Sequence, residues 1–165
     1  MKMQSRRWMV RSVAALLGSS LLLGAALAQD VKKAKLGRSF ADTHPRAVAM
    51  KQFAANVEKA TGGKVVIEVF GNSTLGGEDK MLIALQSGTQ DLYMGALAPI
   101  SARKKEMQIF DFPFLFGSDA EAAHVLDGTV GRKMLDGLAD MNIQGLVWSG
   151  GAFRNMSNSK KPLSA

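Results

Sequence analysis

The chain has 165 residues, no cysteine and a formal net charge of +7. This length suffices for one domain of ordinary size, and the lack of cysteine excludes both disulfides and thiolate metal sites. Because Lys and Arg are scattered rather than gathered into a basic stripe, the composition also argues against a nucleic-acid partner.

The N-terminus has the pattern of a secretory signal peptide. Four basic residues precede an uncharged, apolar stretch from Val13 to Leu27, which is shorter than the roughly 20 residues of a membrane-spanning helix. The stretch ends in Ala26-Leu27-Ala28, a small-x-small cleavage pattern. We predict that signal peptide 1–28 is removed after Ala28 and that the protein is periplasmic, an uncleaved anchor helix being the alternative. Without that segment, 17 Lys and Arg remain against 14 Asp and Glu, a charge of about +3. The pair Arg6-Arg7 leaves both general and twin-arginine export open.

From residue 33 to residue 149, short β-like segments alternate with helical patterns. This alternation predicts an α/β fold with a mixed, mostly parallel sheet flanked by helices. The first strand is predicted over 34–38, and a second, mostly buried strand over 65–70. Between them a helix is predicted from Pro45, a residue favoured in the first helical turn. Its buried face is predicted from the recurring apolar residues Ala49, Phe53, Val57 and Ala60.

A glycine-bounded loop, 71–77, leads to a helix predicted to start at Glu78. Its glycine spacing resembles a phosphate-binding loop, but that motif continues with Lys and Ser or Thr, whereas Gly77 and Glu78 follow here. We therefore interpret the loop as a sharp turn. Glu78 and Asp79 suit the positive end of the helix dipole, and a ligand contact from Glu78 is the alternative.

The helix is predicted to end at Gly88, after which 91–95 returns to the sheet. The aromatic segment 108–116 contains Pro113, which disfavours a central strand, so we predict an extended segment that covers the core. Ser118 and Glu121 have capping-box spacing and predict a helix from Asp119. A further helix is predicted from Val130, with Met134, Leu138 and Met141 on its apolar face, followed by a strand over 144–148.

Arg154 is the first candidate for a binding residue. It follows the predicted strand 144–148 and the pair Gly150-Gly151, and ligands of open α/β sheets bind outside the carboxyl ends of strands. A guanidinium can bind a carboxylate through two parallel hydrogen bonds. We therefore predict a carboxylate-binding role, with a solvated surface arginine as the alternative.

The sequence offers no convincing catalytic or metal site. Ser149 has Val147 where a nucleophile elbow requires glycine, and His44 and His124 are 80 positions apart without metal-site spacing. We predict a protein that is not an enzyme and uses neither a cofactor nor a metal. A small periplasmic hydrolase remains the alternative, and its test is an ester hydrolysis that is lost in Ser149→Ala.

Several motifs, taken in order, resemble the solute-binding subunit of TRAP transporters, of the dicarboxylate-binding (DctP) type. The resemblance implies one lobe of a type II periplasmic-binding-protein fold. It also implies capture of a small organic acid, such as a C4-dicarboxylate, for membrane subunits driven by an ion gradient without ATP. The motifs are His44-Pro45, Gly62-Gly63-Lys64-Val65, Leu75-Gly76-Gly77-Glu78, Gln86-Ser87-Gly88-Thr89-Gln90-Asp91, Phe112-Pro113-Phe114-Leu115-Phe116, and Arg154 with Asn158 and Lys161-Pro162.

The resemblance also implies site residues. By position, Ser39, Glu78 and Ala96 match places where the family contacts ligand, and Arg154 matches an arginine that helps to bind the ligand carboxylate. The family's principal carboxylate-binding arginine falls beyond residue 165. We therefore expect an N-terminal half, with one ligand-binding lobe over 29–156 and 157–165 leading to a missing second lobe. Such a lobe is expected to bind weakly and to self-associate through its exposed interlobe surface, so that a stand-alone interaction lobe is a further alternative.

Overall fold

The computed structural model describes residues 30–150 and residue 159. The predicted signal peptide 1–28 lies outside the described residues, as do Arg154 and, apart from residue 159, the predicted connecting segment 157–165. Within residues 30–150, no helix combines the length and the apolar character needed to cross a bilayer.

In the described part of the chain, three parallel strands form the central sheet, in the order β2-β1-β3. They are β1 (Lys32–Arg38), β2 (Val65–Phe70) and β3 (Leu92–Met94), so the three strands predicted in this part of the sequence are confirmed. In the registers of the two ladders, Leu36 pairs with Val69 on one side and with Leu92 on the other. Because all three strands run in the same direction, their carboxyl ends meet at one edge of the sheet.

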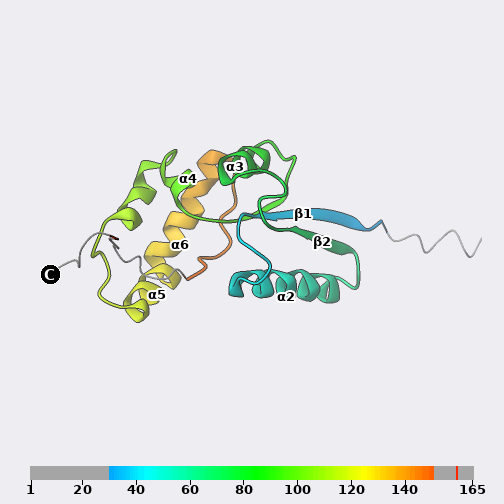
Figure 1. Cartoon of the computed structure of the whole chain (residues 1–165), viewed down its shortest axis with the longest axis horizontal. Coiled ribbons are helices and arrows are strands. Elements are labelled where there is room, and N and C mark those ends of the chain that lie inside the picture. The colour runs from blue at the N-terminus through cyan, green and yellow to red at the C-terminus, as the bar shows by residue number, and fades with distance from the viewer. Residues whose placement is uncertain (1–29, 151–158, 160–165) are drawn as a thin grey trace, which may run out of the picture.

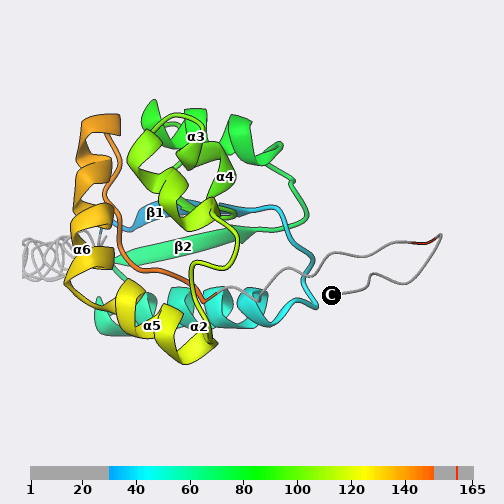
Figure 2. The same ribbon diagram turned by 90° about the vertical axis from the view of Figure 1, so that its left-hand side faces the viewer.

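Helices cover both faces of this sheet, as Figures 1 and 2 show: α2 (Pro45–Ala60) lies on one face and α3 (Glu78–Gln86) on the other. Gly37 of β1 faces α3, since a Cβ atom on Gly37 would lie 2.8 Å from Met81 Sδ. Side chains alternate along a strand, so the buried neighbour Leu36 points to the opposite face. The predicted α/β class is therefore confirmed.

Helix α2 starts at Pro45 as predicted, and the preceding His44 caps it by accepting a hydrogen bond from the Arg46 backbone N–H at 3.2 Å. Its predicted buried face is only half right. Phe53 and Val57 are half-buried, but Ala49 and Ala60 are exposed and Ala47 is the buried alanine. Alanine is compatible with both core and solvent, so alanine positions do not indicate which side of α2 is buried. The packing of α2 against β2 determines the buried side.

Strand β2 is less buried than predicted. Only Ile67 is buried and the other residues of the strand are half-buried. The reason is its position, because β2 is an outer strand of the described sheet whereas β1 has a partner on both sides.

A second group of helices follows the sheet: α4 (Ala98–Ser101), the 3-10 helix η2 (Lys105–Asp111), α5 (Asp119–Asp127), α6 (Thr129–Asp136) and the 3-10 helix η3 (Gly137–Met141). The predicted start of α5 at Asp119 is confirmed, and Ser118 Oγ caps it by accepting from the Glu121 backbone N–H at 3.2 Å. The Glu121 carboxylate accepts from the Gly117 N–H at 2.8 Å rather than from Ser118, so the capping box is only half formed. The predicted apolar face of the next helix is partly wrong: Leu138 is buried, but Val130 is 51% exposed.

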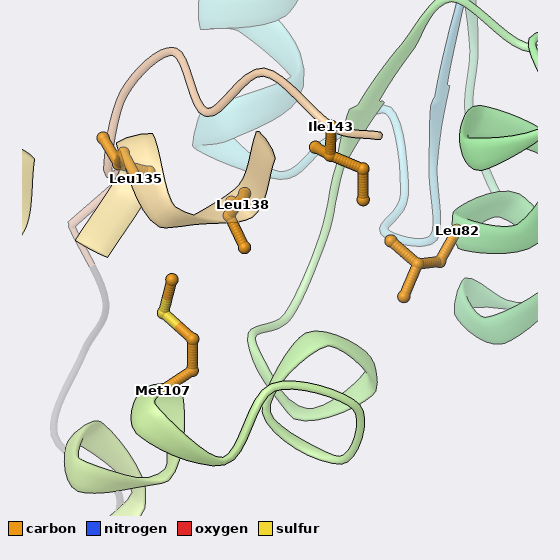
Figure 3. Close-up of a cluster of buried hydrophobic side chains, with 5 residues drawn as sticks. All are labelled: Leu82, Met107, Leu135, Leu138 and Ile143. Carbon is orange, nitrogen blue, oxygen red and sulfur yellow. The ribbon is translucent and has the colours of Figure 1, made fainter. Parts of the chain in front are cut away.

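Three of these helices, η2, α6 and η3, share a core with α3, shown in Figure 3. Leu82 enters this core from α3, and Met107 of η2 points toward Leu138 of η3. Among the described residues, the buried members of this cluster are Leu82, Met107, Leu135, Leu138 and Ile143. The core therefore connects the first helix after the glycine turn to segments more than twenty residues further along the chain.

Two sequence-based predictions in this region are wrong. Residues 108–111 belong to η2, and Phe112 and Phe114 are 66% and 94% exposed rather than packed over the core. Residues 144–148 form no strand. Their backbone carbonyl groups have other partners, because the Arg132 guanidinium donates to Gly145 O at 2.7 Å and to Leu146 O at 3.3 Å.

Candidate ligand-binding site

Three predicted ligand residues meet at the carboxyl edge of the sheet. Ser39 follows β1, Ala96 lies two residues beyond β3, and Glu78 is the first residue of α3. Ser39 Oγ donates to Glu78 Oε1 at 2.5 Å, and the Ala96 backbone N–H donates to the same oxygen at 3.3 Å. We call these three residues the Glu78 cluster.

The turn after β2 explains how Glu78 reaches this edge. Asn72 and Ser73 have left-handed backbone angles, with φ of 52° and 55°, and Gly76 has φ of 109°, which favours glycine. The chain thereby reverses within a few residues and enters α3 through Gly77, whose φ of −66° and ψ of 166° are typical of a helix N-cap. The predicted sharp turn is confirmed.

The adjacent acids Glu78 and Asp79 have different partners. Glu78 points into the cluster, whereas Asp79 forms an ion pair of 3.0 Å with Arg103. The same guanidinium nitrogen of Arg103 donates to Pro99 O at 2.7 Å, which connects the start of α3 to α4. Only the first of the two carboxylates therefore faces the candidate site.

The Glu78 carboxylate has an oxygen available for a ligand. Oε1 accepts both hydrogen bonds of the cluster, and within residues 30–150 no donor is bonded to Oε2. An ionised carboxylate only accepts hydrogen bonds. The cluster can therefore bind a hydroxyl group through Oε2, while its negative charge repels a ligand carboxylate placed directly against it.

Tyr93 of β3 lies next to the cluster. Its hydroxyl oxygen is buried and has no hydrogen-bond partner among the described residues. Burial raises the pKa of Tyr93 above its ordinary value, and the negative charges of Glu78 and Asp79 raise it further. The hydroxyl therefore stays protonated at neutral pH. Gly95 is required beside it, since a Cβ atom there would lie 1.9 Å from the Tyr93 hydroxyl oxygen.

Arg38, at the end of β1, is a feature that the sequence analysis missed. The side chain is 1% exposed, and its guanidinium donates to Phe40 O and to the Asp42 carboxylate. Its Cζ atom lies 5.2 Å from the centre of the Phe40 ring. The Arg38 hydrogen bond lowers the pKa of Asp42, and the charge of Lys51 lowers it further. Arginine is rarely buried, so its position at a strand end gave little reason to single it out.

The structure does not place the fourth predicted ligand residue, Arg154, because it lies outside the described residues. The described segment that leads toward it ends at Gly150, whose carbonyl oxygen accepts a hydrogen bond of 2.6 Å from Arg46 Nη2. Arg46 belongs to the first turn of α2. Gly150, the last residue of this described segment, thus contacts the start of the helix that follows the Ser39 loop.

The sequence matches the family described as bacterial extracellular solute-binding protein, family 7, over residues 36–165. A solute-binding protein of Verminephrobacter eiseniae is 38% identical over 127 residues, which are 77% of this chain and 38% of the relative. The prediction of a binding protein rather than an enzyme is confirmed by this family, so the hydrolase alternative is set aside.

Solved structures agree with this match. A sugar-acid-binding protein from Advenella mimigardefordensis, in complex with galactonate, has 36% sequence identity and a TM-score of 0.65 over 68% of this chain and 37% of that one. A TRAP periplasmic solute-binding protein from Sulfurospirillum deleyianum, with bound succinate, has 31% identity and a TM-score of 0.62 over 66% and 35%.

The chain spans less than two fifths of the length of these three proteins, at 38%, 37% and 35%. The matched part is one lobe of a type II periplasmic-binding-protein fold, with its short parallel sheet between helices. The motifs, the fold and the family match agree, and the chain therefore belongs to bacterial extracellular solute-binding protein family 7, the family of TRAP-transporter solute-binding subunits.

Proposed function

We propose that this chain forms one side of the ligand-binding cleft of a TRAP solute-binding subunit, which captures a small organic acid for membrane subunits. In this proposal, signal peptide 1–28 is removed during export to the periplasm, residues 29–156 form the lobe and 157–165 connect it to a second lobe. The main support is the meeting of Ser39, Glu78 and Ala96 at one carboxylate oxygen, at the edge where ligands of α/β sheets bind.

The chemistry of the Glu78 cluster favours a ligand with hydroxyl groups in addition to its carboxylate. Glu78 Oε2 can accept from a ligand hydroxyl, whereas Ser39 Oγ and the Ala96 N–H are donors that a ligand oxygen can share. Arg154 is proposed to bind the ligand carboxylate. A C4-dicarboxylate without hydroxyl groups would use the proposed carboxylate contact with Arg154 but not Glu78 Oε2. Structures of relatives contain both kinds of acid, galactonate in one and succinate in another.

The lobe by itself is proposed to bind weakly. A ligand cleft needs surfaces on both sides to remove water from the ligand and to orient its contacts. The cluster residues lie at one edge of one sheet, and the matched part of this chain covers less than two fifths of the length of the relatives. Specific capture and delivery to membrane subunits are therefore proposed for the protein that carries both lobes.

We expect galactonate and succinate, added to the 15N-labelled exported protein, to shift the amide signals of Ser39 and Ala96 with dissociation constants well above the micromolar range. Glu78→Gln should weaken galactonate binding about fivefold to tenfold, because one hydrogen bond to a charged acceptor is replaced by a weaker one. Succinate binding should change less, since succinate has no hydroxyl group.

The matched control is Glu106→Gln, an exposed acid of η2 outside the cluster, which should leave both titrations unchanged. If neither acid moves the Ser39 and Ala96 signals, the cluster is not a ligand site. Micromolar binding of either acid would instead contradict the proposal that one lobe is insufficient.

An exposed apolar surface supports self-association of this lobe. We define the aromatic patch as Ile109, Phe112, Phe114 and Leu115, which are 46%, 66%, 94% and 37% exposed. These residues are close together in the chain, and groups of exposed apolar residues commonly mark a contact surface. The exposed interlobe surface is the proposed contact between two copies of the chain, and this patch is proposed to form part of it.

Light scattering should therefore show a mass that rises with protein concentration, and Phe114→Ser should shift the protein toward monomer. Ile83→Ser, which changes an exposed apolar residue of α3 outside the patch, should leave the association unchanged. A constant monomer mass at high concentration would rule out the proposed association.

A further inference from the structure

We propose that Arg38 is a positioning residue for the Glu78 cluster, because its buried guanidinium connects the loop that carries Ser39 to the turn that leads to Glu78. Nothing in the sequence motifs marks Arg38 for this role. The inference rests on the proposed function in one respect only, namely that the cluster is a ligand site.

The first connection is to the loop after β1. The Arg38 guanidinium donates to Phe40 O and pairs with Asp42, and its Cζ atom lies 5.2 Å from the centre of the Phe40 ring. Lys51 of α2 also reaches Asp42, at 3.6 Å. Ser39 lies between Arg38 and Phe40, so these contacts on both sides of it restrict its backbone.

The second connection is to the turn after β2. A Cβ atom on Gly71 would lie 2.5 Å from Arg38 Cζ, so the guanidinium fills the space directly over the Gly71 backbone. Phe40 O, which accepts from Arg38, also accepts from the Asn72 backbone N–H at 3.2 Å. The Ser73 N–H donates to Arg38 O at 3.2 Å. Arg38 therefore contacts both loops where they meet.

The burial of Arg38 indicates that the planar guanidinium is needed to hold the two loops together. The side chain is 1% exposed, and its Nε atom has no hydrogen-bond partner among the described residues. Burying a guanidinium with an unpaired donor costs free energy that an apolar residue would not require. Its planar group of several donors is suited to joining a carbonyl oxygen to a carboxylate in a defined arrangement, which a lysine cannot reproduce.

Arg38 acts through other residues rather than by touching the ligand. Its exposed fraction is only 1%, and Phe40, Asp42 and Gly71 surround the guanidinium. The residues it restrains are Ser39 directly and Glu78 through the turn. The predicted consequence of loosening Arg38 is a weaker Ser39–Glu78–Ala96 arrangement, even when no ligand is present.

The test is the Ala96 amide signal in the 15N-labelled exported protein without ligand. The Ala96 N–H donates to Glu78, whereas the Asp42 carboxylate accepts from Arg38, so we expect Asp42→Ala to reach the Ala96 signal through the two loops. The Asp42 side chain is 58% exposed, and its removal takes one partner from the buried Arg38 guanidinium without substituting Arg38 itself. We expect the Ala96 amide proton to move upfield, in the direction given by Glu78→Gln, because its hydrogen bond weakens.

Asp140→Ala is the matched control, since it removes another exposed carboxylate, the partner of Lys104, away from both loops. It should leave the Ala96 signal unchanged. Gly71→Ala displaces the guanidinium from the other side and should move the signal in the same direction as Asp42→Ala. Arg38→Lys should also move the Ala96 amide signal away from its wild-type position, because a lysine cannot reproduce the contacts of the guanidinium.

An unchanged Ala96 signal in folded Asp42→Ala would overturn the positioning role, whatever Gly71→Ala and Arg38→Lys do. Failure of the proposed function has a different signature, since it is the absence of any response to organic acids in the wild-type protein. The two results are read from separate experiments and can be told apart.

Discussion

The Leu82→Ala variant is expected to lose about 2–5 kcal/mol of unfolding free energy. Leu82 is fully buried and belongs to the core cluster with Met107, Leu138 and Ile143, whose side chains are labelled in Figure 3. Removing its side chain leaves a cavity where α3 meets the later helices. Since proteins of this size are only marginally stable, a loss of this magnitude is a large part of the total. Urea denaturation followed by circular dichroism measures it.

Ile83→Ala is the matched control, because Ile83 is the next residue of the same helix and is 55% exposed. It should change the unfolding free energy by no more than about 0.5 kcal/mol. Both substitutions shorten an apolar side chain to alanine, so helix propensity contributes little to the expected difference between the two unfolding free energies. Similar losses in the two variants would show that α3 does not pack on this core in the orientation described.

The Gly131→Ala variant is expected to lose about 3 kcal/mol, the upper end of the usual range for overpacking. A Cβ atom on Gly131 of α6 would lie only 1.8 Å from the backbone carbonyl oxygen of Leu126 in α5. A backbone atom cannot move aside as the end of a flexible side chain can. We therefore expect α5 and α6 to separate, which thermal unfolding and amide hydrogen exchange in both helices would detect.

Val130→Ala tests the neighbouring position of α6, where the side chain is 51% exposed. This variant should keep near-wild-type stability, and α5 should keep its protection from hydrogen exchange. If Gly131→Ala is as stable as Val130→Ala, the close approach of the two helices is not a feature of the folded protein.

Several elements could be predicted from the sequence because local interactions determine them. The start of α5 depends on Ser118 and Glu121, which are three residues apart. The end of α3 depends on Gly88, whose φ of 74° favours glycine. The turn before Glu78 likewise follows from its glycines. In each case the residues that form the contact are close in the chain, so the pattern is visible in the sequence.

The incorrect predictions concern contacts between distant segments. Residues 144–148 have a strand-like sequence, but a strand requires a neighbouring backbone, and the Arg132 side chain takes two of their carbonyl groups instead. Phe112 and Phe114 were expected to cover the core because they are aromatic. The exposure of these two side chains depends on how the segment packs against the rest of the fold, and the aromatic composition of the segment does not specify that packing.

The sequence by itself determined the α/β class, the three strands and the starts of α2, α3 and α5. Only the tertiary structure decided that Ser39, Glu78 and Ala96 share one carboxylate oxygen, and that Arg38 is buried beside them. The physical reason is that local propensities act over a few residues. Ser39 and Glu78, in contrast, are 39 positions apart and meet because parallel strands end at the same edge of the sheet.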